Sequence, residues 1–373
     1  MNKLIAVNNV AFEGNESKYL LECINTGWLS SEGPFVERFE NEFSKYIGRS
    51  CGISVSNGSA ALDVAVRALK IGPGDEVIIP TFTIISPALS LVKVGAIPVL
   101  VDSNPTTWNM DVLQIEARIT SKTKAILIVH IYGLPVDVEP ILRLAKKYNL
   151  RIIEDAAEMH GQTYLNKKCG SFGDISIFSF YANKLITTGE GGMLLCDDAE
   201  LANRCKKLRN LSFEPDGPRF VHNELGYNYR MTNLQAAIGV AQLEQVDIFI
   251  KKKILLGNYY QDNLQFLERY GYQLPLHQMP FASNIYWVFG LLAPNKIEKD
   301  KLLKHLSKNL IGHRPFFWCM HEQPVFTAMG LFENEIYPVA EHLARCGFYI
   351  PSGLALHQDE LESVVQAIKL FYQ

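Results

Sequence analysis

The strongest constraint on the fold is an alternation of short apolar runs with segments of helical periodicity across the first two thirds of the chain. Strands of a parallel sheet are covered by helices on both faces, so they appear in a sequence as continuous apolar runs. Helical crossovers between such strands are right-handed. The pattern therefore predicts a mixed, mostly parallel sheet with strands at residues 76–79, 97–101, 125–129, 151–154 and 175–180.

Helical spacing in the intervening segments predicts a covering layer of helices on each face of this sheet. Residues 86–93 and 138–148 both carry apolar side chains at helical intervals. The strand–helix alternation favours an α/β fold, which we predict to be a three-layer α/β/α sandwich.

The alternation weakens near residue 250, where the chain becomes rich in aromatic residues. We predict one helix over 233–246 and another that opens at Lys251. A large α/β domain over 1–249 and a smaller C-terminal α+β domain over 250–373 are the expected division of the chain.

Charge and cysteine content exclude several classes of function. The 373 residues carry a formal net charge of −3 with interspersed acids and bases, so no basic stripe is available for nucleic acid. No apolar run is long enough to span a bilayer. Seven scattered cysteines without a C-x-x-C pair are typical of reduced thiols. We therefore expect a cytoplasmic protein without a metal site.

A first candidate site lies in the segment Ser56-Asn-Gly-Ser-Ala60, which opens a helical pattern. Gly58 and Ser59 would offer free N–H groups and a hydroxyl to an anion such as a phosphate. The alternative is that a serine caps the helix beside a turn glycine.

Two further candidates follow predicted strands. Asp155 ends the strand at 151–154, and it either caps the next turn or accepts a hydrogen bond from the protonated ring nitrogen of a cofactor. Lys184 lies between the run at 175–180 and a glycine-rich turn. It is either a surface lysine or an amine with a lowered pKa that forms a Schiff base with a carbonyl group.

The three candidates together indicate one cofactor. A phosphate site, an acidic partner for a ring nitrogen and a Schiff-base lysine are what a protein must supply to pyridoxal 5'-phosphate. The chain contains neither G-x-G-x-x-G nor G-x-x-x-x-G-K-[ST], so dinucleotide and nucleoside-triphosphate sites are disfavoured.

A series of short motifs that extends over nearly the whole chain resembles, in content and order, the DegT/DnrJ/EryC1/StrS family of sugar-nucleotide aminotransferases. The resemblance implies the fold of a fold-type I transferase that depends on pyridoxal phosphate. The motifs are Thr26–Ser31, Ser56–Ala60, Gly72–Val77, His130–Gly133, Glu154–Glu158, Ser179–Lys184, Thr187–Gly192 and Gly226–Thr232.

The resemblance implies a role for each residue of the catalytic group. Lys184 would hold the cofactor as a Schiff base and, once freed, move the proton to and from the substrate carbon. Asp155 would keep the pyridine nitrogen protonated. Glu158 would contact the cofactor near its 3-hydroxyl group.

The same resemblance implies a phosphate site shared between two subunits. Gly58, Ser59 and Ser179 would bind the cofactor phosphate within one chain. Asn228 would reach that phosphate from the neighbouring chain, so a homodimer with shared active sites is expected.

One position departs from the family pattern. Ile84 aligns with the aromatic residue that usually stacks on the cofactor ring. Isoleucine can pack against the ring but loses a π contribution of about 1 kcal/mol. The departure predicts looser cofactor binding or a shifted register.

The reaction that the resemblance implies is amino transfer from L-glutamate to a nucleotide-linked 4-keto-6-deoxyhexose. The expected acceptor is GDP-4-keto-6-deoxy-D-mannose, which would become GDP-perosamine. UDP- or dTDP-linked 3- or 4-keto sugars are the alternatives. A pyridoxal phosphate-dependent dehydratase is disfavoured by Lys184, and a non-enzymatic relative by the intact lysine and aspartate. Candidate substrate contacts are Trp28, Ser30, His130, Arg314 and His321.

Overall fold

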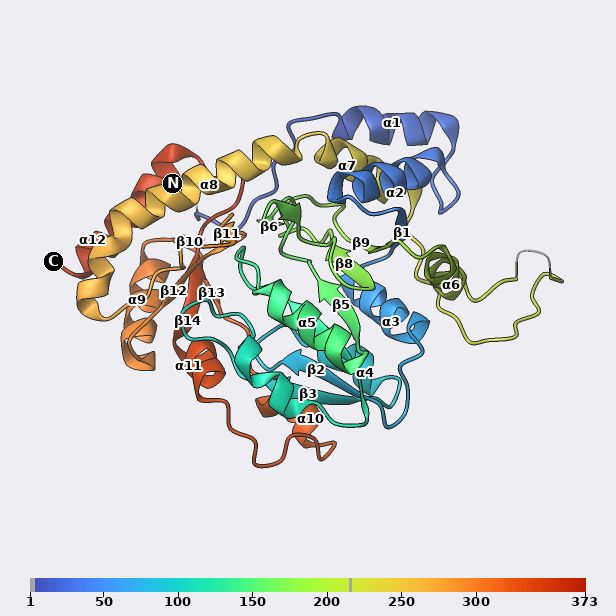
Figure 1. Cartoon of the computed structure of the whole chain (residues 1–373). Coiled ribbons are helices and arrows are strands. Elements are labelled where there is room, and N and C mark those ends of the chain that lie inside the picture. The colour runs from blue at the N-terminus through green and yellow to red at the C-terminus, as the bar shows by residue number, and fades with distance from the viewer. Residues whose placement is uncertain (1–3, 215–216) are drawn as a thin grey trace.

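A seven-stranded sheet forms the centre of the computed structural model, which describes residues 4–214 and 217–373 (Figure 1). Only β9 runs antiparallel to its two neighbours, so the predicted mixed, mostly parallel sheet is confirmed. The strand order is β1 (Cys51–Val55), β9 (Gly192–Cys196), β8 (Ile175–Ser179), β5 (Arg151–Asp155), β4 (Thr123–Val129), β2 (Glu76–Pro80) and β3 (Ile97–Val101).

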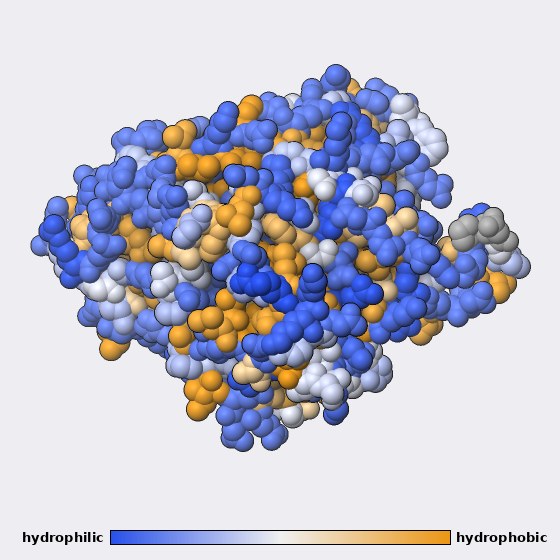
Figure 2. Space-filling view, viewed as in Figure 1, coloured by the Kyte–Doolittle hydropathy of each residue, from blue (hydrophilic) through white to orange (hydrophobic). Residues whose placement is uncertain are grey.

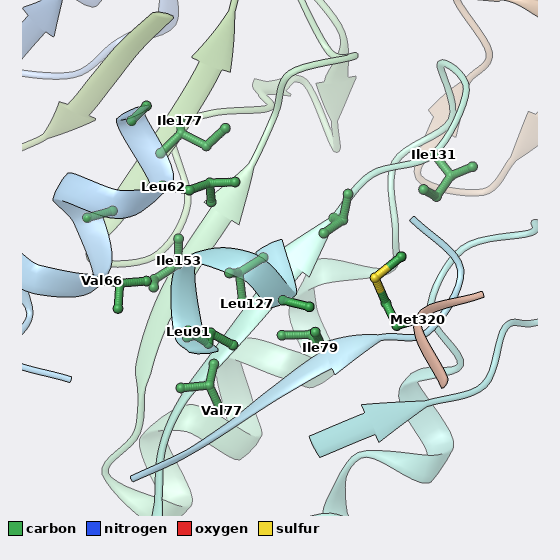
Figure 3. Packing of buried hydrophobic residues seen from close by; sticks show 14 of the residues in the cluster. Leu62, Val66, Val77, Ile79, Leu91, Leu127, Ile131, Ile153, Ile177 and Met320 are labelled. Carbon is green, nitrogen blue, oxygen red and sulfur yellow. The ribbon is translucent and has the colours of Figure 1, made fainter. Parts of the chain in front are cut away.

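Helices cover both faces of this sheet, as predicted for a three-layer sandwich. Successive residues of β2 point to opposite faces of the sheet and pack against different helical layers. Val77 and Ile79 belong to one apolar cluster with side chains of α3 (Gly58–Ala68) and α4 (Ser86–Val92), and Figure 3 shows both strand residues in this cluster together with Leu62, Val66 and Leu91. Ile78 packs in a second cluster, whose helices include α1 (Glu16–Thr26), α2 (Pro34–Ile47), α5 (Val138–Tyr148) and α7 (Asn233–Leu243).

The C-terminal part builds a third apolar cluster around a small antiparallel sheet. Its strand order is β12 (Phe289–Leu292), β14 (Gly347–Ile350), β13 (Arg314–Pro315). The helices α8 (Val246–Leu264), α9 (Lys296–Lys308) and α12 (Gln358–Phe371) contribute side chains to the same cluster.

The remaining elements are short or lie at the edges of the two sheets. The other α-helices are α6 (Ala199–Arg209), α10 (Pro324–Thr327) and α11 (Pro338–Cys346). The 3-10 helices are η1 (Val112–Gln114), η2 (Glu116–Arg118), η3 (Gln265–Tyr270) and η4 (Met320–Glu322), and the two-residue strands are β6 (Thr163–Tyr164), β7 (Lys167–Lys168), β10 (Gln278–Met279) and β11 (Ala282–Ser283).

The helix boundaries around residue 245 differ from those predicted. The helix expected over 233–246 ends at Leu243, and the next one begins at Val246 rather than at Lys251. The sequence carries no glycine or proline at this break, which is why it was not predicted. The domain boundary at 249/250 stays a prediction, since it falls inside α8.

No helix in residues 4–214 and 217–373 combines the length and the apolar character that crossing a bilayer requires. All seven cysteines lie within these ranges as free thiols.

An exposed arm, residues 217–226, connects α6 to the segment before α7. Figure 1 shows this segment extending away from the body beyond α6, and Figure 2 shows hydrophobic side chains on it. Phe220, Val221 and Leu225 are 73%, 53% and 83% exposed. Such a concentration of solvent-facing apolar side chains is typical of a surface that another protein covers.

Candidate active site

A cavity of about 600 Å³ lies at the carboxyl ends of the parallel strands. This is the edge of an open α/β sheet at which ligands bind. The small C-terminal sheet and its preceding segment close the opposite wall. Of the residues predicted from the sequence, the cavity brings together Gly58, Ser59, Ile84, Asp155, Glu158, Ser179 and Lys184.

Lys184 lies in the irregular loop between β8 and β9, and its amine points into a nearly closed environment. Its side chain is 11% exposed, with Nζ 3.8 Å from Oε1 of Glu158 and 4.0 Å from the ring centre of Trp287. Burial lowers the pKa of the Lys184 amine, and the carboxylates of Glu158 and Asp155 oppose that change. The lysine is therefore a buried amine with a lowered pKa, which excludes the surface-lysine alternative.

Asp155 is the last residue of β5 and is 3% exposed. Its Oδ1 accepts a hydrogen bond from the N–H of Ala157 at 3.1 Å. Within the described residues its other oxygen has no hydrogen-bond donor. Burial raises the pKa of Asp155 to about 6, an effect that the positive charge of Lys184 reduces. A cationic ring nitrogen in the cavity would supply the missing partner.

Glu158, three residues after Asp155, lies between Lys184 and the main chain of Tyr132. Its Oε2 accepts a hydrogen bond from the N–H of Tyr132 at 2.7 Å. Burial raises the pKa of Glu158, and Lys184 acts in the opposite direction. The two acids and the lysine form one cluster whose protonation states depend on each other.

The helix that follows Ser56 is capped by Asn57, whose Oδ1 accepts from the N–H of Ala60 at 2.8 Å. The alternative of a serine N-cap is therefore wrong. Ser59 instead pairs through Oγ with Oγ of Ser86 at 2.7 Å. A Cβ on Gly58 would lie 2.9 Å from Cβ of Ser179, so glycine permits the close approach of β8 to the helix N-terminus. Hydroxyls and free first-turn N–H groups thus surround a space suited to a phosphate.

Two buried polar atoms without hydrogen-bond partners bear on whether this cavity fits pyridoxal phosphate. Oγ1 of Thr83 and Oδ1 of Asn183 are buried without a hydrogen-bond partner in the part of the chain that the structure describes, and both residues line the cavity. An unsatisfied buried polar group costs about 1–3 kcal/mol, so such groups indicate a missing ligand. Together with the amine, the two acids and the helix N-terminus, they fit a polar, phosphorylated cofactor.

The structure does not bring the two predicted histidines to the cavity. Nε2 of His130 lies 3.0 Å from Oε1 of Glu154, and its Nδ1 accepts from the N–H of Val136 at 3.1 Å. The ring nitrogens of His321 contact Oγ1 of Thr81 and a carboxylate oxygen of Glu341. Both rings are buried with both nitrogens occupied. Their predicted substrate contacts are corrected to framework roles.

The other predicted contacts are exposed. The carbonyls of Trp28 and Ser30 accept hydrogen bonds from Asn233, and neither residue lines the cavity. Asn228 is exposed and also lies outside it. Arg314 lines a second cavity of about 420 Å³, which shares four wall residues with the first. Substrate or cofactor contacts of these residues stay predictions.

Ile84 is 48% exposed, and its side chain borders the cavity opening near the other cofactor candidates. Its stacking on the cofactor ring stays a prediction. The fully buried Phe82 does not line the cavity, so it offers no replacement for the missing aromatic ring.

Sequence reasoning missed the aromatic wall of the site. Trp287, Phe317 and Tyr349 come from the C-terminal third and line the cavity. Tyr132 supports them: its ring stacks on Phe317 at 5.2 Å, and its hydroxyl accepts from the N–H of Phe317 at 3.1 Å. The aromatic richness of this region was visible in the sequence, but the direction of each ring was not.

Comparison with known proteins gives consistent matches over the whole chain. The profile of the DegT/DnrJ/EryC1/StrS aminotransferase family matches residues 11–369. GDP-perosamine synthase of Escherichia coli O157:H7 is 40% identical over 375 residues, covering 99% of each chain. GDP-perosamine synthase of Caulobacter vibrioides is also 40% identical and covers 98% of this chain and 97% of its own. Among solved structures, S. venezuelae DesV is 31% identical with a TM-score of 0.89, covering 96% of this chain and 95% of its own.

Proposed function

Since the chain belongs to the DegT/DnrJ/EryC1/StrS aminotransferase family, we propose that it transfers an amino group from L-glutamate to GDP-4-keto-6-deoxy-D-mannose, giving GDP-perosamine. The chain is a pyridoxal phosphate-dependent sugar aminotransferase of this family. The observation that carries the proposal is the buried cluster of Lys184, Glu158 and Asp155 at the carboxyl edge of the sheet.

When bound, pyridoxal phosphate supplies the electron sink that makes loss of a proton from the substrate carbon possible. Lys184 would hold the cofactor and would move that proton through Nζ, which requires a neutral amine. Burial of Lys184 favours the neutral form. Asp155 would keep the ring nitrogen protonated, and Glu158, whose Oε1 lies 3.8 Å from Nζ, would orient Lys184.

Three features support binding of the phosphate at the N-terminus of α3. Ser59 and Ser179 border the cavity beside the first turn of the helix, and the absence of a side chain on Gly58 lets Ser179 lie close to that turn. The positive end of the helix favours an anion. We propose that these residues hold the cofactor phosphate.

The choice of nucleotide and hexose rests on the relatives. Three GDP-perosamine synthases are 37–40% identical to this chain over nearly its full length. A dTDP-3-amino-3,6-dideoxy-alpha-D-galactopyranose transaminase is 33% identical. These values favour a GDP-linked 4-keto sugar. We propose Arg314 as a contact for the sugar or diphosphate, since it is exposed beside the shared aromatic wall.

A competition assay tests the acceptor. Purified protein is given glutamate and equal amounts of GDP-, UDP- and dTDP-linked 4-keto-6-deoxy sugars, with the 3-keto isomers in a second mixture. We expect the GDP-linked 4-keto sugar to be aminated at least about tenfold faster, because a site built to hydrogen-bond one base leaves polar groups unpaired with another. The products are measured by mass spectrometry. Preferential amination of a UDP- or dTDP-linked sugar would replace the acceptor while leaving the reaction class intact.

We also propose that the protein acts in the cytoplasm as a homodimer with shared active sites. Asn228 lies just after the exposed arm and does not line the cavity of its own chain. A partner that covers Phe220, Val221 and Leu225 would bury apolar surface and could bring Asn228 to the phosphate of the other subunit.

Mixed dimers test this arrangement. Asn228→Asp should disable the homodimer, because a carboxylate would repel the cofactor phosphate. Lys184→Ala disables the homodimer for a different reason. Random mixing of the two chains should restore about a quarter of the wild-type activity, because half of the dimers then contain one intact site of two. If mixing restores no activity, Asn228 does not act across the interface.

A further inference from the structure

Trp287 contacts two consecutive residues of the catalytic loop. Its Nε1 donates a hydrogen bond to the carbonyl of Asn183 at 3.0 Å, and the Nζ of Lys184 lies over its ring at 4.0 Å from the centre. The loop between β8 and β9 that carries both residues contains no helix or strand. Trp287 therefore contacts both the main-chain carbonyl of Asn183 and the amine of Lys184.

The backbone of Trp287 is held firmly in place by its neighbours. The preceding Tyr286 is fully buried and lies flat against Gly257, where a Cβ would come within 2.1 Å of the ring. On the other side, Gly133 has a φ of +102°, and a Cβ there would lie 2.6 Å from the N atom of Trp287. The N–H of Ile285 also donates to the carbonyl of Gly133 at 3.2 Å. The backbone from which the indole extends therefore has little freedom to move.

The same corner of the chain also positions the other contact of the amine. Tyr132, which precedes Gly133, donates its N–H to Glu158 at 2.7 Å. Tyr132 has a φ of +57°, an unusual conformation for a residue with a side chain. The corner at 132–133 thus fixes Glu158 on one side of the lysine and Trp287 on the other.

We propose that Trp287 is a positioning residue that holds the amine of Lys184 where it can attach to the cofactor and later exchange a proton. The inference rests on the proposed role of Lys184. The alternative is that Trp287 is only a wall of the cavity, as Phe317 is. A wall affects how tightly the cofactor binds, whereas a positioning residue affects how fast the lysine reacts.

The experiment separates attachment from binding in full-length, cofactor-free protein. Pyridoxal phosphate is added, and its covalent attachment is followed by absorbance. Pyridoxamine phosphate, which has no aldehyde and cannot attach, reports binding alone through calorimetry. In Trp287→Leu we expect attachment to slow about tenfold, because misplacement of a reacting group by a fraction of an ångström is costly. Binding of pyridoxamine phosphate should match the wild type.

Two further variants control for stability and for ring loss. Trp287→Phe keeps a ring face but loses the hydrogen bond to Asn183, so an intermediate rate is expected. It also replaces the leucine variant if that variant fails to fold. Trp108→Leu is the matched control: Trp108 is 3% exposed in the same apolar cluster and does not line the cavity, so attachment should keep its wild-type rate.

Two results would overturn the inference: attachment at the wild-type rate in Trp287→Leu, or weaker pyridoxamine phosphate binding by the same factor as attachment. A separate readout tests the premise. Reduction of the wild-type complex with borohydride followed by peptide mapping should place the cofactor mass on Lys184. Cofactor mass on another lysine would refute the role of Lys184 itself, independently of Trp287.

Discussion

Replacing Lys184 by alanine is expected to slow amino transfer by about 10⁴-fold, the upper range for removal of a positioned acid–base group. Lys184 is the only basic side chain among the residues that line the cavity in the described part of the chain. Among those described residues, no second amine lines the cavity to take over the proton transfer from Lys184. The rate is measured by single-turnover mixing with the keto sugar, and mass spectrometry quantifies the amino sugar.

Lys253 provides the matched control for removal of a buried lysine. Lys253 is 3% exposed, its Nζ donates to the carbonyl of Ser352, and burial lowers its pKa to about 7. It does not line the active-site cavity. Lys253→Met should retain amino transfer, whereas Lys184→Ala should retain only pyridoxamine phosphate binding. Normal turnover by Lys184→Ala would mean that another group performs the chemistry.

Replacing Asp155 by asparagine is expected to lower the rate of amino transfer by about 10³-fold, within the range for loss of an acid–base partner. Asparagine can still accept the hydrogen bond from the N–H of Ala157, so the local turn survives. It cannot carry the negative charge that keeps a ring nitrogen protonated. The electron-withdrawing power of the cofactor therefore falls, and the proton on the substrate carbon becomes harder to remove. Single-turnover rates and the absorbance of the bound cofactor measure the effect.

A cofactor analogue separates this role from simple capping. Pyridoxal phosphate methylated on the ring nitrogen is permanently cationic and needs no carboxylate to hold a proton. It should recover part of the activity of Asp155→Asn. If Asp155 only caps the turn, the variant keeps wild-type kinetics with the natural cofactor and the analogue brings no gain.

The cofactor-free protein gives an independent check through its stability. Burial raises the pKa of Asp155 from 3.8 to about 6, so folding favours the protonated acid. The contribution to stability is fully present below pH 3.8 and is lost as the pH rises through about 6. The melting temperature of Asp155→Asn should therefore fall less than that of the wild type as the pH rises from 3.8 to about 6. Equal pH profiles would mean that Asp155 is not desolvated.

The strands and the main catalytic candidates were predictable because their signals are local. A strand covered on both faces must be apolar along its length, and the run at 76–79 became β2 with only one residue added. Asp155 and Lys184 were found because parallel strands bring their carboxyl ends to one edge. Polar residues just after such strands are therefore neighbours in space, although they are far apart in the chain.

His130, a substrate contact predicted from the family resemblance, shows why a position at a strand end does not suffice. His130 comes directly after β4, and Asp155 is the last residue of β5. From the sequence alone, both residues are therefore expected at the edge of the sheet that carries the site. Its ring, however, turns into the framework and pairs with Glu154 on the adjacent strand. The direction of a side chain at a strand end depends on residues from other segments, and the residues near it in the sequence carry no signal that predicts these contacts.

The sequence by itself determined the α/β architecture, the edge of the sheet that carries the site, and the identity of its acid and amine. Only the tertiary structure decided which groups surround that amine. Trp287 lies 103 positions after Lys184 and touches it because the C-terminal sheet packs against the loop at 181–190. Periodicity and strand-end polarity act over a few residues, whereas the environment that tunes a buried amine is assembled from segments that meet only when the chain is folded.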